Sequence, residues 1–285
     1  MLFRTTLPSQ KYPFEMHYEH AYCFVGSCFS DHLGSFFVDH QFTTLSNPFG
    51  TLFNPYSIAD NLKNSIVNQG IDNQYIYSLG DHYVSFLNQG KFHHSDYNQL
   101  QSIISSIYNE VNQFLKKAEY LFITWGTAYV YRFIERDIIV GNCHKIPNHQ
   151  FKKERLSVEE IVSIYHDLIQ SLLEINPQLR IIFTVSPVRH LSDGFHENQL
   201  SKSILHLAID QLTDQKNSFY FPAYELIMDD LRDYRFYASD LCHIGENGIQ
   251  YVLEHFIATF FNEKTQQQLQ KNRSIIKRTQ HKPLK

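Results

Sequence analysis

The sequence has 285 residues, of which 43% are hydrophobic and 19% are charged, and its formal net charge is −4 at pH 7. This size and composition predict one α/β domain of about 250 residues followed by a tail, and the negative charge argues against general binding of nucleic acid. No stretch has the roughly 18 consecutive apolar residues of a membrane helix, and residues 1–8 lack the apolar core of a signal peptide.

Strands and helices alternate along the chain. Short apolar runs rich in β-branched and aromatic residues predict strands, and apolar residues at i, i+3 and i+4 predict helices. In chain order we expect strand 21–26, helix 29–40, strand 42–46, helix 57–68, helix 97–117, strand 120–124, helix 157–175, strand 179–185, helix 198–215, strand 219–221, helix 224–231 and helix 246–261. The alternation predicts a three-layer α/β/α fold around a mostly parallel five-stranded sheet.

Two segments fall outside this alternation. Residues 70–96 form a long connection rich in aromatic residues and histidine. A connection of this length is uncommon unless it is functional, so it is either a lid over a site or an irregular packed loop. Residues 130–140 alternate in hydrophobicity on both sides of a polar turn, which predicts a hairpin inserted near 130–145.

Residues 21–30 (AYCFVGSCFS) combine a strand, a glycine break and a helix start. A nucleophile on such a sharp turn is held above a sheet, with backbone N–H groups nearby for an oxyanion. The helix start also lowers the pKa of a cysteine, so Cys28 is a candidate nucleophile. The alternative is that Cys28 packs as a small hydrophobe. The four cysteines show no CxxC spacing, which predicts free thiols in a reducing cytoplasm.

A second feature precedes the last predicted helix of the domain. Asp240 lies three residues before His243. At this spacing a carboxylate can accept a hydrogen bond from one ring nitrogen while the other takes a proton from a nucleophile. The alternative is that Asp240 only caps a helix.

Together, these features resemble the GSCFA-domain family, a branch of the SGNH/GDSL-like hydrolase superfamily, over roughly residues 1–262. The resemblance implies an SGNH-hydrolase-like, flavodoxin-like fold. The blocks that carry it are 26–30 (GSCFS), 47–55 (NPFGTLFNP), 125–130 (WGTAYV), 142–145 (NCHK), 184–191 (TVSPVRHL), 197–202 (ENQLSK) and 233–243 (DYRFYASDLCH).

The resemblance implies a role for several positions. It places Cys28 in the nucleophile position, with Ser27 where the superfamily usually has an aspartate, and it makes Asp240 and His243 the closing dyad. Ser27 is also a second candidate nucleophile. The resemblance also implies that Gly50 is a backbone donor to the oxyanion. Gly126 and Thr127 would belong to the third sequence block of the superfamily, which reads Gly-x-Asn.

The third block departs from the superfamily, because its oxyanion asparagine is replaced by Ala128. Asn142, from the predicted hairpin insertion, is a candidate replacement, and His144 would be carried over the site beside it. Arg189 is a candidate ligand for a carboxylate or phosphate of the substrate. For Arg189 and His190 the alternative is a structural role at the end of a strand.

The resulting hypothesis is a hydrolase or acyltransferase acting on a small-molecule or glycan acyl ester, such as a carbohydrate or cell-envelope precursor. The alternative is a non-catalytic ligand-binding module on a degenerate hydrolase fold. We expect no metal site, because the 16 histidines include no HxxxH or HExxH pair. We expect no cofactor, since no GxGxxG or Walker loop occurs. The oligomeric state stays open.

The C-terminal residues 263–285 are strongly basic. From residue 262 onward there are seven Lys or Arg and one acid. This composition predicts a basic tail outside the domain at 1–262, as either a solvated extension or an amphipathic surface helix that contacts an anionic surface.

Overall fold

A computed structural model describes residues 4–214 and 216–280 of the chain, and its centre is a five-stranded sheet. The strands are β1 (Ala21–Gly26), β2 (Thr43–Ser46), β6 (Tyr120–Trp125), β10 (Arg180–Val185) and β11 (Ser218–Tyr220). They lie in the order β11-β10-β6-β1-β2, and every neighbouring pair is parallel. This is the strand order of a flavodoxin-like fold, which the family resemblance implied.

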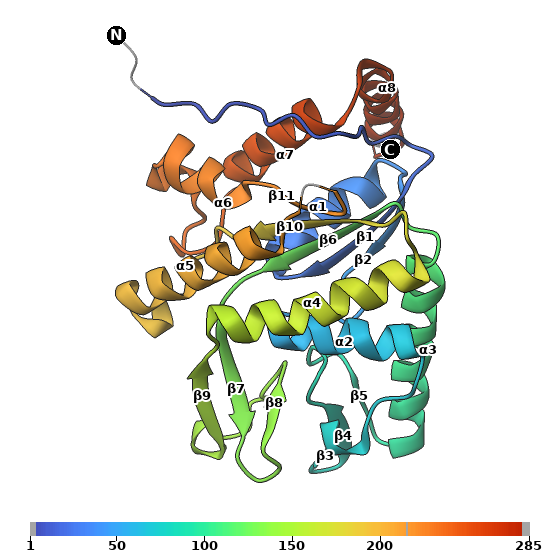
Figure 1. Ribbon diagram of the computed structural model, residues 1–285, viewed down its shortest axis with the longest axis vertical. Helices are drawn as coiled ribbons and strands as arrows, with labels where there is room; N and C mark the ends of the chain where they lie inside the picture. Colours follow the sequence, from blue (N-terminus) through green and yellow to red (C-terminus); the bar gives the residue numbers. More distant parts are fainter. Residues whose placement is uncertain (1–3, 215, 281–285) are drawn as a thin grey trace, which may run out of the picture.

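Helices cover both faces of this sheet (Figure 1). On β6, Leu121 and Ile123 pack on one face, and Tyr120 and Phe122 pack on the other. The first face is covered by α2 (Pro55–Val67), α3 (Tyr97–Leu115), α4 (Val158–Ile175) and α5 (Phe195–Leu212). The second face is covered by α1 (Cys28–Asp39), α6 (Ala223–Glu225), a π-helical turn (Leu226–Leu231) and α7 (Glu246–Phe260). The three-layer α/β/α fold is therefore confirmed.

Local sequence explains where several helices begin. Asn54 caps α2 by accepting from Ser57 N, directly before the proline that opens the helix. Asp96 caps α3. Ser157 and Glu160 form a reciprocal capping box at the start of α4. Short 3-10 turns complete the connections: Asn73–Tyr75, Asn148–Gln150, Leu191–Asp193 and Tyr234–Phe236.

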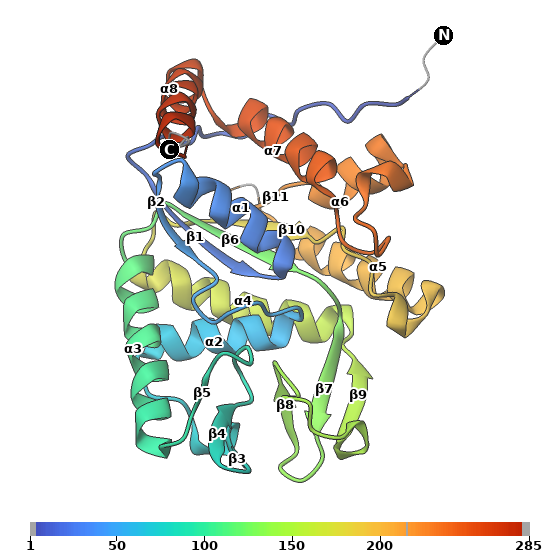
Figure 2. The same ribbon diagram turned by 180° about the vertical axis from the view of Figure 1, so that it is seen from behind.

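Both predicted insertions are small antiparallel sheets, and Figure 2 shows them beyond α2 and α4. The connection 70–96 holds β3 (Ile76–Leu79), β4 (His82–Ser85) and β5 (His93–His94), which the sequence analysis missed. The predicted hairpin is present as β7 (Tyr129–Phe133) and β8 (Ile138–Val140), with a third strand, β9 (Phe151–Arg155). β9 was not predicted, because its residues are mostly polar. Its Glu154 is tied to Arg132 of β7 by an ion pair.

The start of the basic tail forms helix α8 (Glu263–Gln280). The first turns of α8 pack against the domain. Thr265 and Leu269 are buried there, and Asn272 Nδ2 donates to the carbonyl of His40. Residues 281–285 lie outside the described part of the chain. The division of the chain at residue 262 stays a prediction.

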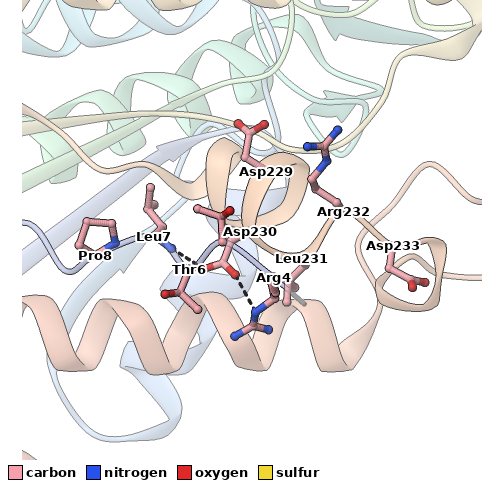
Figure 3. A pocket seen from close by; sticks show the side chains of 10 residues that line it. Arg4, Thr6, Leu7, Pro8, Asp229, Asp230, Leu231, Arg232 and Asp233 are labelled. Atoms are coloured by element: carbon pink, nitrogen blue, oxygen red, sulfur yellow. Dashed lines mark hydrogen bonds and ion pairs between the residues drawn. The ribbon is translucent and has the colours of Figure 1, made fainter. Parts of the chain in front are cut away.

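The N-terminal segment runs along the outside of the second helical layer. The buried carboxylate of Asp230 holds it by accepting from the amide of Leu7 and the hydroxyl of Tyr251 and by pairing with Arg4. A cavity of about 980 Å³ lies between this segment and residues 229–233 (Figure 3). Across residues 4–214 and 216–280, no helix is long and apolar enough to cross a membrane.

Candidate active site

The predicted site residues after four strands meet at one edge of the sheet. The parallel register aligns the strand ends, because Phe24 lies opposite Ser46, and Gly26 lies opposite Thr124. On the other side of β6, Trp125 pairs with Val185. Cys28, Gly50, Gly126–Thr127 and residues 186–190 therefore follow neighbouring strand ends, which is where open α/β sheets bind ligands.

Gly26 makes the sharp turn between β1 and α1. Its φ of +134° belongs to glycine, and a Cβ there would lie 2.1 Å from the carbonyl oxygen of Thr124. The amide of Gly26 donates to Asn47 Oδ1 at 2.8 Å. Cys28 is then the first residue of α1, and Ser27 is its N-cap. The strand–turn–helix arrangement around Cys28 is confirmed.

Ser27 lies inside this turn. Its side chain is 1% exposed, and its Oγ has no hydrogen-bond partner among the described residues. The Ser27 hydroxyl therefore does not stabilise the turn through a hydrogen bond to a described residue. Burial also keeps the hydroxyl from a substrate in this state.

The surroundings of Cys28 overturn the expected direction of its pKa. Burial and then the carboxylate of Asp31 raise the pKa of the Cys28 thiol, against the lowering by the amides of Cys28 and Phe29 and by the charge of Lys202. Asp31 is held in place by Asn47 Nδ2 at 2.6 Å and by the hydroxyl of Thr51 at 3.0 Å. The helix start does favour the thiolate, but this effect is outweighed.

Asp240 and His243 form the predicted carboxylate–imidazole pair. Asp240 Oδ2 lies 2.6 Å from Nδ1 of His243, and Oδ1 accepts from the amides of Cys242 and His243. The Cys242 amide and then the His243 ring lower the pKa of Asp240 to about 2. Because an ionised carboxylate only accepts hydrogen bonds, Nδ1 of His243 is the donor. Nε2 is left to accept a proton.

The loop that carries His243 joins the same sheet edge. The amide of Arg189, just after β10, donates to the carbonyl of Cys242. The charge of His243 also lowers the pKa of His32, although burial is the larger cause. His32 lies four residues after Cys28 and thus on the same face of α1. Among the described residues, no hydrogen bond joins Cys28 to His243 in this ligand-free state. Catalytic contacts often tighten only when substrate binds.

The other predicted oxyanion donors are engaged within the protein. The amide of Gly50 donates to the carbonyl of Asn47, and the amides of Gly126 and Thr127 both donate to the carbonyl of Phe53. The expectation that these amides face an oxyanion is therefore wrong for this state. The sequence could not show this, because the accepting carbonyls come from segments that only the fold brings near.

Hydrogen bonds to a side chain of α5 also occupy polar groups of the third block. Ala128 is fully buried, and its amide donates to Ser201 Oγ at 2.8 Å. The hydroxyl of Thr127 pairs with the same Ser201 oxygen at 3.0 Å.

The residues predicted from the hairpin insertion have separate positions. Asn142 accepts from the amide of His144 and lines a pocket of about 270 Å³ with Thr127 and His190. His144 Nε2 instead lies 2.7 Å from the carbonyl oxygen of Ser85 in β4, and burial lowers its pKa. The expectation that His144 reaches over the strand ends is wrong, because its ring bonds to the neighbouring small sheet.

Arg189 and His190 are both half-buried but have different partners. Arg189 donates to the hydroxyl of Tyr234 at 3.4 Å, and its guanidinium faces the rings of Tyr234 and Phe195. His190 donates its amide to Asn198 Oδ1. Burial, and then the charge of Lys202, lower the pKa of His190 to about 4. Its ring is therefore neutral near pH 7.

Lys202 is the site residue that the sequence analysis missed. Its Nζ donates to the carbonyl oxygens of Gly126 and Ser186, at 2.6 Å each, and the side chain is 1% exposed. A signal was present in the sequence. The buried stripe of α5 runs back from Ile209 and Leu205 to Lys202, so the lysine lies on the core side of an amphipathic helix.

These observations define a doubly wound α/β protein whose candidate site lies at the carboxyl edge of its sheet. Within the described ranges, no three His, Cys, Asp or Glu side chains gather so as to hold a metal ion. The chain belongs to the GSCFA family, whose model matches residues 22–256.

A search of curated proteins found no match. Among solved structures, the chain is similar to a carbohydrate esterase family 3 protein from Talaromyces cellulolyticus, with 10% sequence identity and a TM-score of 0.31. The match covers 60% of this chain and 65% of the esterase chain, which is less than two thirds of that protein.

Proposed function

We propose that the protein is an SGNH-like hydrolase or acyltransferase that acts on an acyl ester through Cys28. His243 is the base, and Asp240 orients it. The observation that carries the proposal is the 2.6 Å contact between Asp240 and His243 Nδ1, on a loop joined to the sheet edge that carries Cys28. A nucleophile, a base and an orienting carboxylate are the set that acyl transfer needs.

The proposed reaction has two halves. His243 Nε2 takes the Sγ proton of Cys28, and the thiolate attacks the ester carbonyl carbon, so that the carbonyl electrons move onto oxygen. The tetrahedral intermediate collapses to a thioester, and the alcohol leaves with the proton from His243. Water or another acceptor then gives a proton to His243, attacks the thioester and releases the thiol.

The N-terminus of α1 is the proposed oxyanion site. The amides of Cys28 and Phe29 point toward the Cys28 sulfur in the free protein. The same amides and the helix dipole favour negative charge beside that sulfur. This arrangement does not need Gly50, Gly126 or Thr127, whose amides are already engaged.

The pocket beside the inserted sheet is the proposed substrate wall. Its volume is about 270 Å³, and it joins Asn142 and His190 with the aromatic side chains of Phe53, Tyr129 and Tyr131. Aromatic rings with a few polar groups fit the acyl ester of a carbohydrate or of a cell-envelope precursor. We also propose a cytoplasmic location, since all four cysteines are unpaired.

Asp240→Asn tests the pair. We expect turnover of p-nitrophenyl acetate, and of an acetylated sugar, to fall about 10²-fold, because the neutral amide no longer fixes the His243 tautomer or stabilises the imidazolium. Asp72→Asn is the matched control. The carboxylate of Asp72 also accepts an amide two residues on, from Gln74, in the distant 3-10 turn. Equal turnover in both variants would contradict the assignment.

Two observations favour a second function, a ligand-binding module without catalysis. Burial and Asp31 raise the pKa of Cys28, and three of the predicted oxyanion amides are engaged. If this function is the true one, wild-type protein turns over no ester, but an acetylated sugar still raises its melting temperature.

A further inference from the structure

Lys202 is a buried cation without a carboxylate. The residues that the structure describes place no Asp or Glu within ion-pair distance of its Nζ, which instead bonds to two backbone carbonyls at the ends of β6 and β10. A buried ammonium group is costly unless an anion compensates it. The charged form of Lys202 is therefore favoured only when a nearby group carries a negative charge.

The hydrogen bonds of Lys202 suit an amine that changes its charge. A neutral amine has two N–H groups, and the carbonyls of Gly126 and Ser186 accept both. The ammonium form has a third N–H that gains a strong partner only if an anion is near. Burial lowers the pKa of Lys202 to about 7. Both forms are therefore populated near neutral pH.

The groups that interact with Lys202 come from three elements. They are Cys28 on α1, His190 after β10 and His206 on α5. Burial lowers the pKa of both histidines to about 4, so neither is an anion or, near pH 7, a competing cation. Cys28 is the group among these three that becomes negative. It lies at the same strand end as Lys202, because Lys202 Nζ bonds to the carbonyl of Gly126, just after β6, and the amide of Ser27, next to Cys28, bonds to the carbonyl of Thr124 in β6. The charges of Cys28 and Lys202 favour each other.

We propose that Lys202 is a positioning residue of this site, and that its buried ammonium group is the counter-ion of the Cys28 thiolate. This inference rests on the proposed role of Cys28 as the nucleophile. No proton has to pass between the two residues. His243 takes the Sγ proton, and the nearby ammonium group lowers the free energy of the thiolate that remains. Without Lys202, only the amides of Cys28 and Phe29 would favour the thiolate, against burial and the carboxylate of Asp31.

The test is the rate of iodoacetamide alkylation at Cys28 against pH, followed by peptide mass. In Lys202→Met we expect the midpoint to rise and the rate near neutral pH to fall about tenfold, which is the effect of losing one nearby opposite charge. Cys143 in the same sample is the internal control. It is also half-buried, and its rate should not change. Asp31→Asn should move the Cys28 midpoint in the opposite direction.

A reciprocal measurement covers the case in which Lys202→Met does not fold. The coupling of two charges is symmetric. A fixed negative charge in Cys28→Asp should therefore raise the pKa of Lys202, followed by NMR of protein labelled at lysine Cε, with the neutral Cys28→Ser as the control. An unchanged Cys28 midpoint in folded Lys202→Met, or the same Lys202 titration in Cys28→Asp and Cys28→Ser, would overturn the inference. Neither measurement uses a substrate, so failure of the ester assay is a separate result.

Discussion

Gly26→Ala is expected to lower the free energy of unfolding by at least about 3 kcal/mol. The added Cβ would lie 2.1 Å from the carbonyl oxygen of Thr124, on a backbone whose φ is +134°. The turn cannot move away from β6, because the amide of Gly26 bonds to Asn47 and its carbonyl accepts from Leu52. The substitution thus strains the backbone and separates β1 from β6.

Two other glycines separate these causes. Gly80 has a φ of +67° and no atom within 4 Å of an added Cβ, so Gly80→Ala should cost only the backbone strain, about 1 kcal/mol. Gly90 has neither a positive φ nor a neighbour, so Gly90→Ala should change stability by less than about 1 kcal/mol. Urea unfolding of the three variants gives the comparison. Gly26→Ala as stable as Gly90→Ala would refute the tight turn before Cys28.

Cys28→Ala is expected to reduce ester turnover by at least about 10³-fold, because no other group then forms the acyl intermediate. Ser27→Ala distinguishes the neighbouring candidate. The Ser27 hydroxyl is buried without a partner, so its loss should leave turnover within about threefold and stability little changed. The measurement is kcat for p-nitrophenyl acetate, with far-UV circular dichroism to confirm folding. The opposite ranking of the two variants would move the nucleophile to Ser27.

Much of the fold could be predicted because the information is local. β6 and β10 are apolar on both faces, as buried parallel strands must be, and Asp96 and Ser157 mark helix starts through their own side chains. Gly26, the last residue of β1, indicated the turn before Cys28 for the same reason. The Asp240–His243 contact also spans only three residues, so the spacing contained it.

The missed features depend on contacts between distant segments. β9 shows no apolar alternation, and its pairing with β7 decides its structure. The amides of Gly126 and Thr127 are engaged by Phe53, some 70 residues earlier in the chain. Lys202 lies on the apolar stripe of α5, but only the packing of α5 shows that its side chain is buried. The pKa of Cys28 depends on burial and on how Asn47 and Thr51 hold Asp31.

The most direct test of the central claim is to look for the acyl group on Cys28. Wild-type protein turning over p-nitrophenyl acetate is quenched in acid, digested, and the peptide masses are measured. The proposed reaction predicts one acetyl group on the peptide that contains Cys28, lost on treatment with hydroxylamine and missing from Cys28→Ala. Turnover with no acetyl group on this peptide, or with the group retained in Cys28→Ala, would contradict acyl transfer through Cys28.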